Sequence, residues 1–314
     1  MFVDYFQDMK SEPKYVILGC QGSGTNLVSR LLQQTLEFSV VHDRSLIFNA
    51  AVGLMRDQES LGLQYAKIRK RIFPGKLRRR FMLKRHYRQA KHFQGLPSTI
   101  DSDLVKTPED FANYLYAYHG YTTNAMHLGL KSDDLWESVE HIDVVIPNRR
   151  YLLLVRDPRD NAISITNKDF GPRNLYAASQ YVQKRMSLYQ AEVDRRTDIE
   201  AITIKYEDLL NEPQRQMETI AQEWRLNLCD DYIHRVEGLG IRKHNQSKWK
   251  KLSSEDLGVC ESVLGEQIEK YDYPRSEQAK VELNKIHRIY YTASDVALRI
   301  PQRVYKTCRN FIRT

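Results

Sequence analysis

The sequence lacks the long apolar runs that would cross a lipid bilayer. A membrane-spanning helix needs about 20 consecutive apolar residues, whereas the longest runs here, such as residues 152–155, have the length of a β-strand. Residues 1–15 contain acidic side chains where a signal peptide would carry positive charge followed by an apolar stretch. We therefore expect a protein that is not exported and that acts in the cytoplasm.

Cysteine is also scarce. The four cysteines, Cys20, Cys229, Cys260 and Cys308, lie far apart in the sequence and form no C-x-x-C pair. This spacing predicts neither a disulfide framework nor a zinc site. Such cysteine usage fits a reducing compartment, and we expect no bound metal.

Acidic residues are missing between Glu59 and Asp101. Residues 67–91 contain twelve Lys and Arg, so the net charge of +8 comes from this segment while the remainder of the chain is net negative. A basic run of this kind can contact nucleic acid, an anionic membrane surface or an acidic glycan, or it can be a solvated surface segment.

The pattern of short apolar runs predicts the fold class. The apolar runs at 15–19, 151–155 and 201–204 predict buried strands, and segments with helical spacing follow them. Alternating strands and helices form a parallel β-sheet that helices cover on both faces. We expect this α/β architecture, with further helices over 174–196, 212–224 and 279–313.

A glycine-containing loop follows the first predicted strand and precedes a predicted helix. It reads GCQGSGTN over residues 19–26. Compared with the G-x-x-x-x-G-K-[ST] loop of nucleotide hydrolases, Thr25 replaces the lysine and Asn26 replaces the hydroxyl that holds magnesium. Backbone N–H groups and a helix N-terminus still favour an anion. The loop therefore predicts a phosphate site without magnesium-dependent phosphoryl transfer, although a simple turn between strand and helix would also explain it.

Three further segments carry residues suited to a phosphorylated ligand. Arg156 ends a predicted strand, and Ser164 lies about two helical turns further on. Tyr206 follows the strand at 201–204, where it could stack on a purine or lie in the core. Arg242 and Lys243 precede Trp249 in a charged loop, where two cations and an indole could hold a phosphate and cover a base.

Taken in this order, the four segments resemble the PAPS-dependent sulfotransferases, where PAPS is 3′-phosphoadenosine-5′-phosphosulfate. GCQGSGTNLVSRLL is similar to the 5′-phosphosulfate loop, usually x-[RK]-S-G-T-[TN]-L-L, and YLLLVRDPRDNAISI to the 3′-phosphate segment. IKYEDLLNEPQ and RKHNQSKWKKLSSED match the Tyr-Glu-Asp segment and the C-terminal loop. The resemblance spans residues 15–273 and is weakest across 50–125.

The resemblance implies a three-layer P-loop-like fold and a site that binds PAPS. It implies one domain over 1–314, in which 50–125 form a basic, helical insertion on the acceptor side and 279–313 a C-terminal helical extension. The implied cofactor-binding residues are those of the four segments: Gln21, Gly22, Ser23, Gly24, Thr25, Asn26, Arg156, Ser164, Tyr206, Arg242, Lys243 and Trp249.

The sequence departs from the family at the residue before Ser23, where Gly22 replaces a Lys or Arg. Loss of one such group typically costs about 3 kcal/mol of transition-state stabilisation. Lys131 is the candidate to supply the charge. Candidates for the base that takes the acceptor proton are Asp43 first, then His42 and Asp133, each of which could equally be an ordinary surface residue.

These observations predict sulfuryl transfer from PAPS to a hydroxyl, on a carbohydrate or glycolipid. The basic run 67–91 suits an acidic or lipid-linked glycan and could touch the anionic inner face of a membrane; it matches no nucleic-acid module. Alternatives are a non-catalytic relative, a P-loop nucleotide kinase, and a membrane- or nucleic-acid-binding protein. The helix predicted at 279–313, with Arg299, Arg303, Lys306 and Arg309, could lie on a membrane or pack as a terminal helix.

Overall fold

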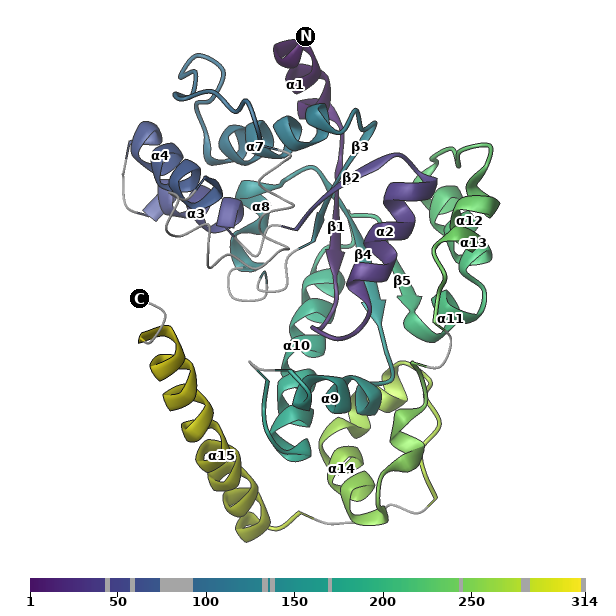
Figure 1. Cartoon of the computed structure of the whole chain (residues 1–314). Helices are drawn as coiled ribbons and strands as arrows, with labels where there is room; N and C mark the ends of the chain where they lie inside the picture. Colours follow the sequence, from purple (N-terminus) through teal and green to yellow (C-terminus); the bar gives the residue numbers. More distant parts are fainter. Residues whose placement is uncertain are drawn as a thin grey trace.

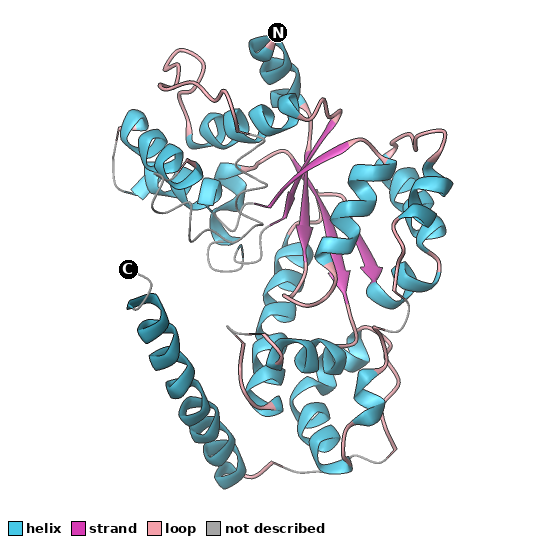
Figure 2. Ribbon diagram, viewed as in Figure 1, coloured by secondary structure: helices cyan, strands magenta, loops and turns pink. Residues whose placement is uncertain are grey.

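The computed structural model has a central sheet of five parallel strands (Figure 2). The structure describes residues 1–42, 46–56, 60–73, 93–131, 135, 139–168, 171–242, 245–277 and 283–311. The strand order is β2-β3-β1-β4-β5, which confirms the predicted α/β class with a parallel sheet. The strands are β1 (Lys14–Leu18), β2 (Phe38–His42), β3 (His127–Lys131), β4 (Arg149–Val155) and β5 (Ala201–Lys205).

The strands at the centre of the sheet are apolar because they are buried on both faces. All five residues of β1 are buried. Ile17 is in register with Leu152 of β4 on one side and with Lys131 of β3 on the other. Alternate residues of β1 therefore enter two separate cores, Tyr15 and Ile17 on one face and Val16 and Leu18 on the other.

Helices cover both faces of the sheet and complete three layers (Figure 1). On the face with Ile17 the core contains residues of α2 (Thr25–Thr35), α11 (Tyr206–Asn211), α12 (Pro213–Trp224) and α13 (Tyr232–Gly238). On the face with Val16 the helices are α1 (Phe2–Ser11), α3 (Leu46–Arg56), α4 (Leu61–Ile72), α7 (Pro108–Thr122), α8 (Ile142–Val145), α9 (Pro158–Thr166), α10 (Leu175–Arg195) and α14 (Ser254–Lys270).

The helical segments predicted from sequence correspond to α2, α10, α12 and α15 (Lys285–Phe311). Short 3₁₀ helices occur at η2 (Val139–His141) and η3 (Lys248–Lys251). Cys20, Cys229 and Cys260 form no disulfide. Among the described residues, no helix is long and apolar enough to cross a membrane.

Most of the basic run 67–91 lies outside the described residues, which resume at Phe93. Its first part, including Lys67 and Arg69, belongs to α4. α3, α4 and α7 form a helical layer beyond the β2 side of the sheet (Figure 1). Where it is described, the segment expected to shape the acceptor side thus contains these helices together with the turns and loops of residues 93–107.

Candidate functional site

The carboxyl ends of β1 and β4 meet where the chain changes direction across the sheet. After β1 the chain adds β2 and β3 on one side, and it then crosses to add β4 and β5 on the other. In open parallel sheets, ligands bind in the crevice beyond such a switch point. The loop of residues 19–24 follows β1 and Arg156 follows β4, so both border this crevice.

Gly24 begins α2 and sets the shape of the loop. It has a left-handed backbone with φ 102°, and a Cβ at this position would collide with the ring of buried Tyr206. The backbone N–H of Ser23 donates to the carbonyl oxygen of Cys20 at 2.9 Å and closes the turn. The first N–H groups of α2 have no intrahelical partner, which makes this helix start suited to an anion.

Gly22 is packed against α9. Its φ is +90°, and a Cβ there would lie 2.8 Å from Oδ1 of Asn161 and 3.2 Å from Oγ of Ser164. Both the backbone conformation and the lack of space therefore require glycine. With this backbone conformation, a lysine at position 22 would be strained.

Arg156 joins the loop after β1 to a second loop that follows α13. Its Nη1 donates to the carbonyl oxygen of Gly22 at 2.8 Å, and its Nη2 donates to the carbonyl oxygen of Asn245 at 2.8 Å. Nη2 also lies 3.4 Å from Oδ2 of Asp160, which is completely buried. The guanidinium is thereby fixed in the crevice beside Gly22.

Tyr206 lies between the loop and this arginine. The guanidinium carbon of Arg156 is 4.8 Å from the centre of the Tyr206 ring, a distance at which a cation and an aromatic face attract each other. Nδ2 of Asn245 donates to the Tyr206 hydroxyl at 3.0 Å. One role of Tyr206 is therefore to support Gly24 and Arg156.

Trp249 packs on the second arginine of this segment. The Arg159 guanidinium carbon is 3.7 Å from the centre of the indole ring. Arg159 is fully buried and forms ion pairs with Asp157 at 2.7 Å and with Glu261 at 2.6 Å. The backbone N–H of Trp249 donates to Oδ1 of Asp160 at 2.9 Å. These contacts fix the loop before α14 against the start of α9.

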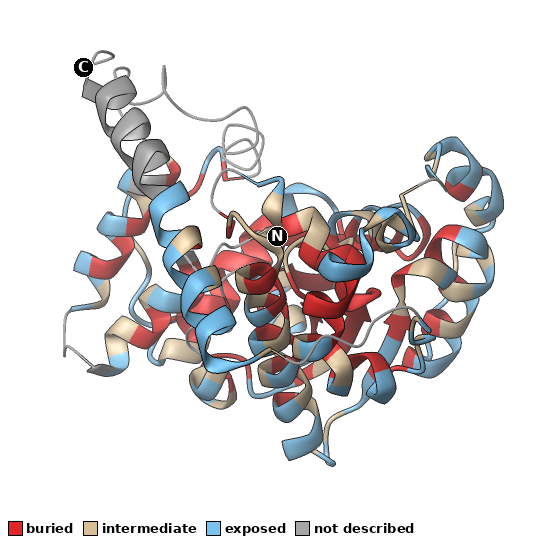
Figure 3. Cartoon of the chain, turned by 90° about the horizontal axis from the view of Figure 1, so that it is seen from below, coloured by how far each residue is buried: buried red, intermediate tan, exposed pale blue. Residues whose placement is uncertain are grey.

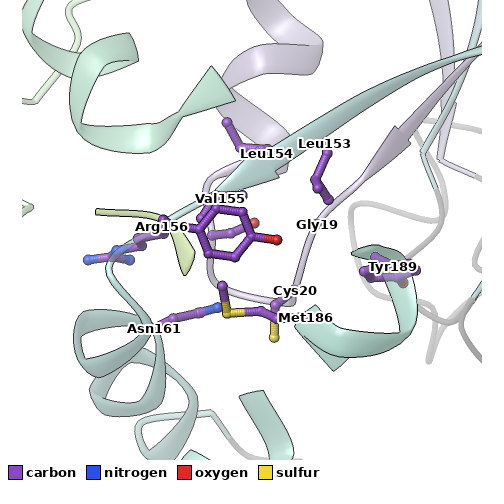
Figure 4. Close-up of a pocket in the computed structure, with 11 residues that line it drawn as sticks. Gly19, Cys20, Leu153, Leu154, Val155, Arg156, Asn161, Met186 and Tyr189 are labelled. Atoms are coloured by element: carbon purple, nitrogen blue, oxygen red, sulfur yellow. The ribbon is translucent and has the colours of Figure 1, made fainter. Parts of the chain in front are cut away.

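Several buried polar groups around the loop have no hydrogen-bond partner among the described residues. They are Oγ of Ser23, the side-chain amide of Asn161 and Nε of Arg156. All three residues line a cavity of about 10 Å³ behind the loop. In Figure 4, Asn161 points toward Cys20 and Met186, whereas the guanidinium of Arg156 points away from them. Buried polar groups usually find partners, so this cluster is typical of a site that a polar ligand or an ordered water completes.

Lys248 is a cation of this site that the sequence analysis did not select. Burial lowers the pKa of Lys248, and the neighbouring positive charges of Arg156 and Lys168 lower it further, while Asp160 opposes them. Arg156, Lys168 and Lys248 are thus near enough for their charges to interact. Their mutual repulsion is relieved when an anion binds. The position of Lys248 directly before Trp249 was the available sequence signal.

His42 and Lys131 lie side by side at the carboxyl ends of β2 and β3, in register with each other. Side chains along a strand point alternately to the two faces of the sheet. His42 comes two residues after Val40, and Lys131 two residues after Gly129, so both side chains face the layer that contains α2. Lys131 is buried and His42 is half-buried. The predicted catalytic residues Asp43 and Asp133 lie outside the described residues.

The described members of the predicted cofactor set do not all lie at the crevice. Gly22, Ser23, Gly24, Arg156 and Ser164 converge on the crevice, as the contacts above show, and Tyr206 and Trp249 support it. Arg242 is exposed, and Lys243 lies outside the described residues. Thr25 is buried and Asn26 is exposed at the start of α2.

Gln21 connects the loop with α10. The hydroxyl of Tyr181 donates to Oε1 of Gln21. The Arg185 guanidinium carbon lies 3.2 Å from the centre of the Tyr181 ring. A cation on α10 is thus linked to the loop through two contacts.

The sheet order, the glycine loop after β1 and the arginine after β4 define a P-loop-like α/β protein. A model of the sulfotransferase family matches residues 13–230, more than half of the chain. The chain therefore belongs to the sulfotransferase family, a class of enzymes that transfer sulfuryl groups.

Solved structures with the same fold are also sulfotransferases. The sulfotransferase domain from the curacin biosynthetic pathway matches with a TM-score of 0.54 and 16% identity, covering 84% of this chain and 99% of that domain. The sulfotransferase domain from the Synechococcus PCC 7002 olefin synthase gives a TM-score of 0.51 and 13% identity, covering 84% and 95%. No curated protein sequence matches the chain. At these identities the likeness concerns the fold.

Proposed function

We propose that this sulfotransferase uses PAPS as the donor and transfers its sulfuryl group to a hydroxyl of an acceptor. The proposal depends above all on one observation. Arg156 donates to the Gly22 carbonyl in the crevice beyond the switch point, Ser164 packs against Gly22, and the charge of Lys248 interacts with that of Arg156. The family generally uses PAPS.

The described residues fit this donor. The start of α2 suits the 5′-phosphosulfate, because backbone N–H groups and the helix dipole favour an anion. Arg156, Ser164 and Lys248 suit the 3′-phosphate, because cations and a hydroxyl form charge-assisted hydrogen bonds to it. When bound, PAPS supplies a sulfuryl group whose S–O bond to the 5′-phosphate breaks as the acceptor oxygen bonds to sulfur.

Among the residues that we propose to assist this transfer, Lys131 and His42 end the strands β3 and β2, on the other side of β1 from β4. Lys131 is our candidate for the positive charge that Gly22 does not provide, because it is a buried cation at the end of β3. Asp43, then His42 and then Asp133, are the candidates for the base that removes the acceptor proton. Asp43→Asn should lower turnover while leaving cofactor affinity nearly unchanged; full activity in this variant would assign the base elsewhere.

For the acceptor we propose a carbohydrate or glycolipid. The basic segment 67–91 suits an acidic or lipid-linked glycan and an anionic membrane surface. Nucleic acid is not favoured. The scarce and scattered cysteines support a cytoplasmic location.

A non-catalytic relative that binds the same nucleotide is the second candidate. It is favoured by Gly22, whose backbone conformation and crowding leave no room for the usual cation. Such a relative would keep the cofactor crevice without turnover.

The first experiment is a thermal-shift titration with 3′,5′-ADP, compared with 5′-ADP plus magnesium. A ligand at about 100 times its Kd adds about 2.7 kcal/mol of stability. Selective stabilisation by 3′,5′-ADP supports the PAPS site, whereas preference for 5′-ADP with magnesium would indicate a kinase. Release or transfer of a radiolabelled sulfuryl group from PAPS then separates the enzyme from a non-catalytic relative.

A further inference from the structure

Helix α15 contacts the rest of the protein through one face only among its described side chains. Nδ2 of Asn174 donates to the carbonyl oxygen of Tyr291 at 2.6 Å and to Oγ of Ser294 at 2.9 Å. The backbone N–H of Arg173 donates to Oδ1 of Asp295 at 2.5 Å. These contacts attach the first half of α15 to the start of α10.

A different face of α15 presents apolar side chains to solvent. Ile286 is 74% exposed, Ile289 68% and Val296 54%. Their spacing of three and seven residues, with Ala293 between them, places them along one stripe of the helix. The stripe lines a shallow apolar groove, and Figure 3 colours most of residues 285–298 as exposed.

The charges beside this stripe have one sign. Lys285 and Arg288 lie on the same side of it by helical position. Asp295 is the only acidic residue in α15, and it is buried against Arg173. The sequence from 299 to 314 contains no acidic residue. The exposed part of the helix therefore combines apolar and basic character.

We propose that α15 docks the enzyme on an anionic membrane surface, with its apolar stripe inserted at the level of the lipid headgroups. A helix with an apolar stripe flanked by Lys and Arg lies in the plane of such a surface, gaining both apolar burial and attraction to anionic lipid. A second copy of the chain fits less well, because pairing two such helices brings rows of like charge together. The docking surface consists of Lys285, Ile286, Arg288, Ile289, Ala293 and Val296.

The test is flotation of the full chain with vesicles of phosphatidylcholine plus phosphatidylglycerol, and with vesicles of phosphatidylcholine alone. We expect binding to the anionic vesicles only, weakened by added salt. Ile289→Asp and Val296→Asp should each reduce partitioning by about tenfold or more, because each removes one inserted side chain. Arg288→Glu should reduce it by about fivefold or more.

Ile233→Asp is the matched control, since Ile233 is an exposed helical isoleucine on α13. It should leave vesicle binding unchanged. Thermal unfolding of each variant shows whether it is folded. Absence of binding, or binding that the α15 variants leave unchanged, would overturn the proposal, and in the second case variants in 67–91 would be tested next. A concentration-dependent dimer that Ile289→Asp abolishes would assign the stripe to a second copy and also overturn it.

Discussion

The guanidinium of Arg156 donates a hydrogen bond to the carbonyl oxygen of Gly22, with 2.8 Å between Nη1 and that oxygen. The two residues are 134 positions apart in the sequence and come from the ends of β1 and β4. The arginine thus fixes the conformation of the loop that begins α2. Any change in this guanidinium affects both the charge of the crevice and the shape of the loop.

Arg156→Ala should weaken binding of 3′,5′-ADP far more than binding of AMP. The variant removes the cation that we assign to the 3′-phosphate, a group that AMP lacks, and charge-assisted hydrogen bonds contribute about 1.5–3 kcal/mol each. Calorimetric titration of both nucleotides provides the measurement. Equal losses for the two nucleotides would contradict the assignment.

Two further variants separate this effect from damage to the fold, because Arg156→Ala also leaves buried Asp160 without its ion pair. Ser164→Ala removes only a hydroxyl. It should also weaken binding of 3′,5′-ADP more than binding of AMP, but by a smaller factor than Arg156→Ala. Arg215→Ala, at an exposed arginine of α12, should change neither affinity.

Gly22→Lys should not restore the activity expected of the family's usual cation. With φ at +90° and a Cβ 2.8 Å from Asn161 Oδ1, the substitution strains the loop, and we expect it to cost about 1–3 kcal/mol of stability. The melting temperature and the turnover number test this together. Gly62→Lys is the control, since nothing lies within 4 Å of a Cβ at Gly62. A stable Gly22→Lys enzyme with faster turnover would show that the loop accommodates the cation.

Affinity for 3′,5′-ADP should fall with rising pH because of Lys248. Burial and nearby cations hold the pKa of Lys248 below its ordinary value of 10.5. The ammonium is present below that lowered pKa and is lost as the pH rises through it, so its share of the affinity is lost in the alkaline range. Titrations at increasing pH should show that affinity for 3′,5′-ADP declines in the wild type. The decline should be absent in Lys248→Ala and present in Lys251→Ala, a variant of an exposed neighbouring lysine. An unchanged decline in Lys248→Ala would assign it to another group.

Lys14, at the amino end of the central strand β1, should make the free energy of unfolding depend on pH. Burial lowers the pKa of Lys14 from 10.5 to about 8, and Nζ donates to the carbonyl oxygen of Glu12 at 2.7 Å. Between these two pKa values the unfolded chain binds more protons than the folded one. The free energy of unfolding should therefore rise with pH in this window, by at most about 3 kcal/mol.

Denaturant unfolding between pH 7 and 10 measures this slope. Lys14→Met should flatten it, whereas Lys251→Met should retain it. Equal slopes in the wild type and in Lys14→Met would show that the Lys14 ammonium keeps an ordinary pKa.

The sequence predicted the elements whose signal is local. The apolar runs of β1, β4 and β5 and the helical spacing of α2, α10 and α12 all correspond to observed elements. β3 was not predicted, because its sequence HLGLK has polar ends and a glycine. It is a strand because Leu128 and Leu130 enter the core between two neighbouring strands.

The candidate site was predictable where a motif marks the residue and unpredictable where contacts define it. Arg156, Ser164 and Gly24 were selected from sequence, and their contacts bring them to one crevice. Lys248 and Asn161 were not selected, because their role depends on how the last loop and α9 fold against β4. The packing of Trp249 on Arg159 likewise requires two segments about ninety residues apart to meet.

β1 lies between β3 and β4 and separates two groups of candidate functional residues. Residues expected to hold the nucleotide come from the β4 side, whereas His42, Lys131 and the helices of segment 50–125 belong to the β3 side. The loop after β1 lies between these two groups of residues. A change in the helices of segment 50–125 therefore need not alter the nucleotide site that we propose on the β4 side.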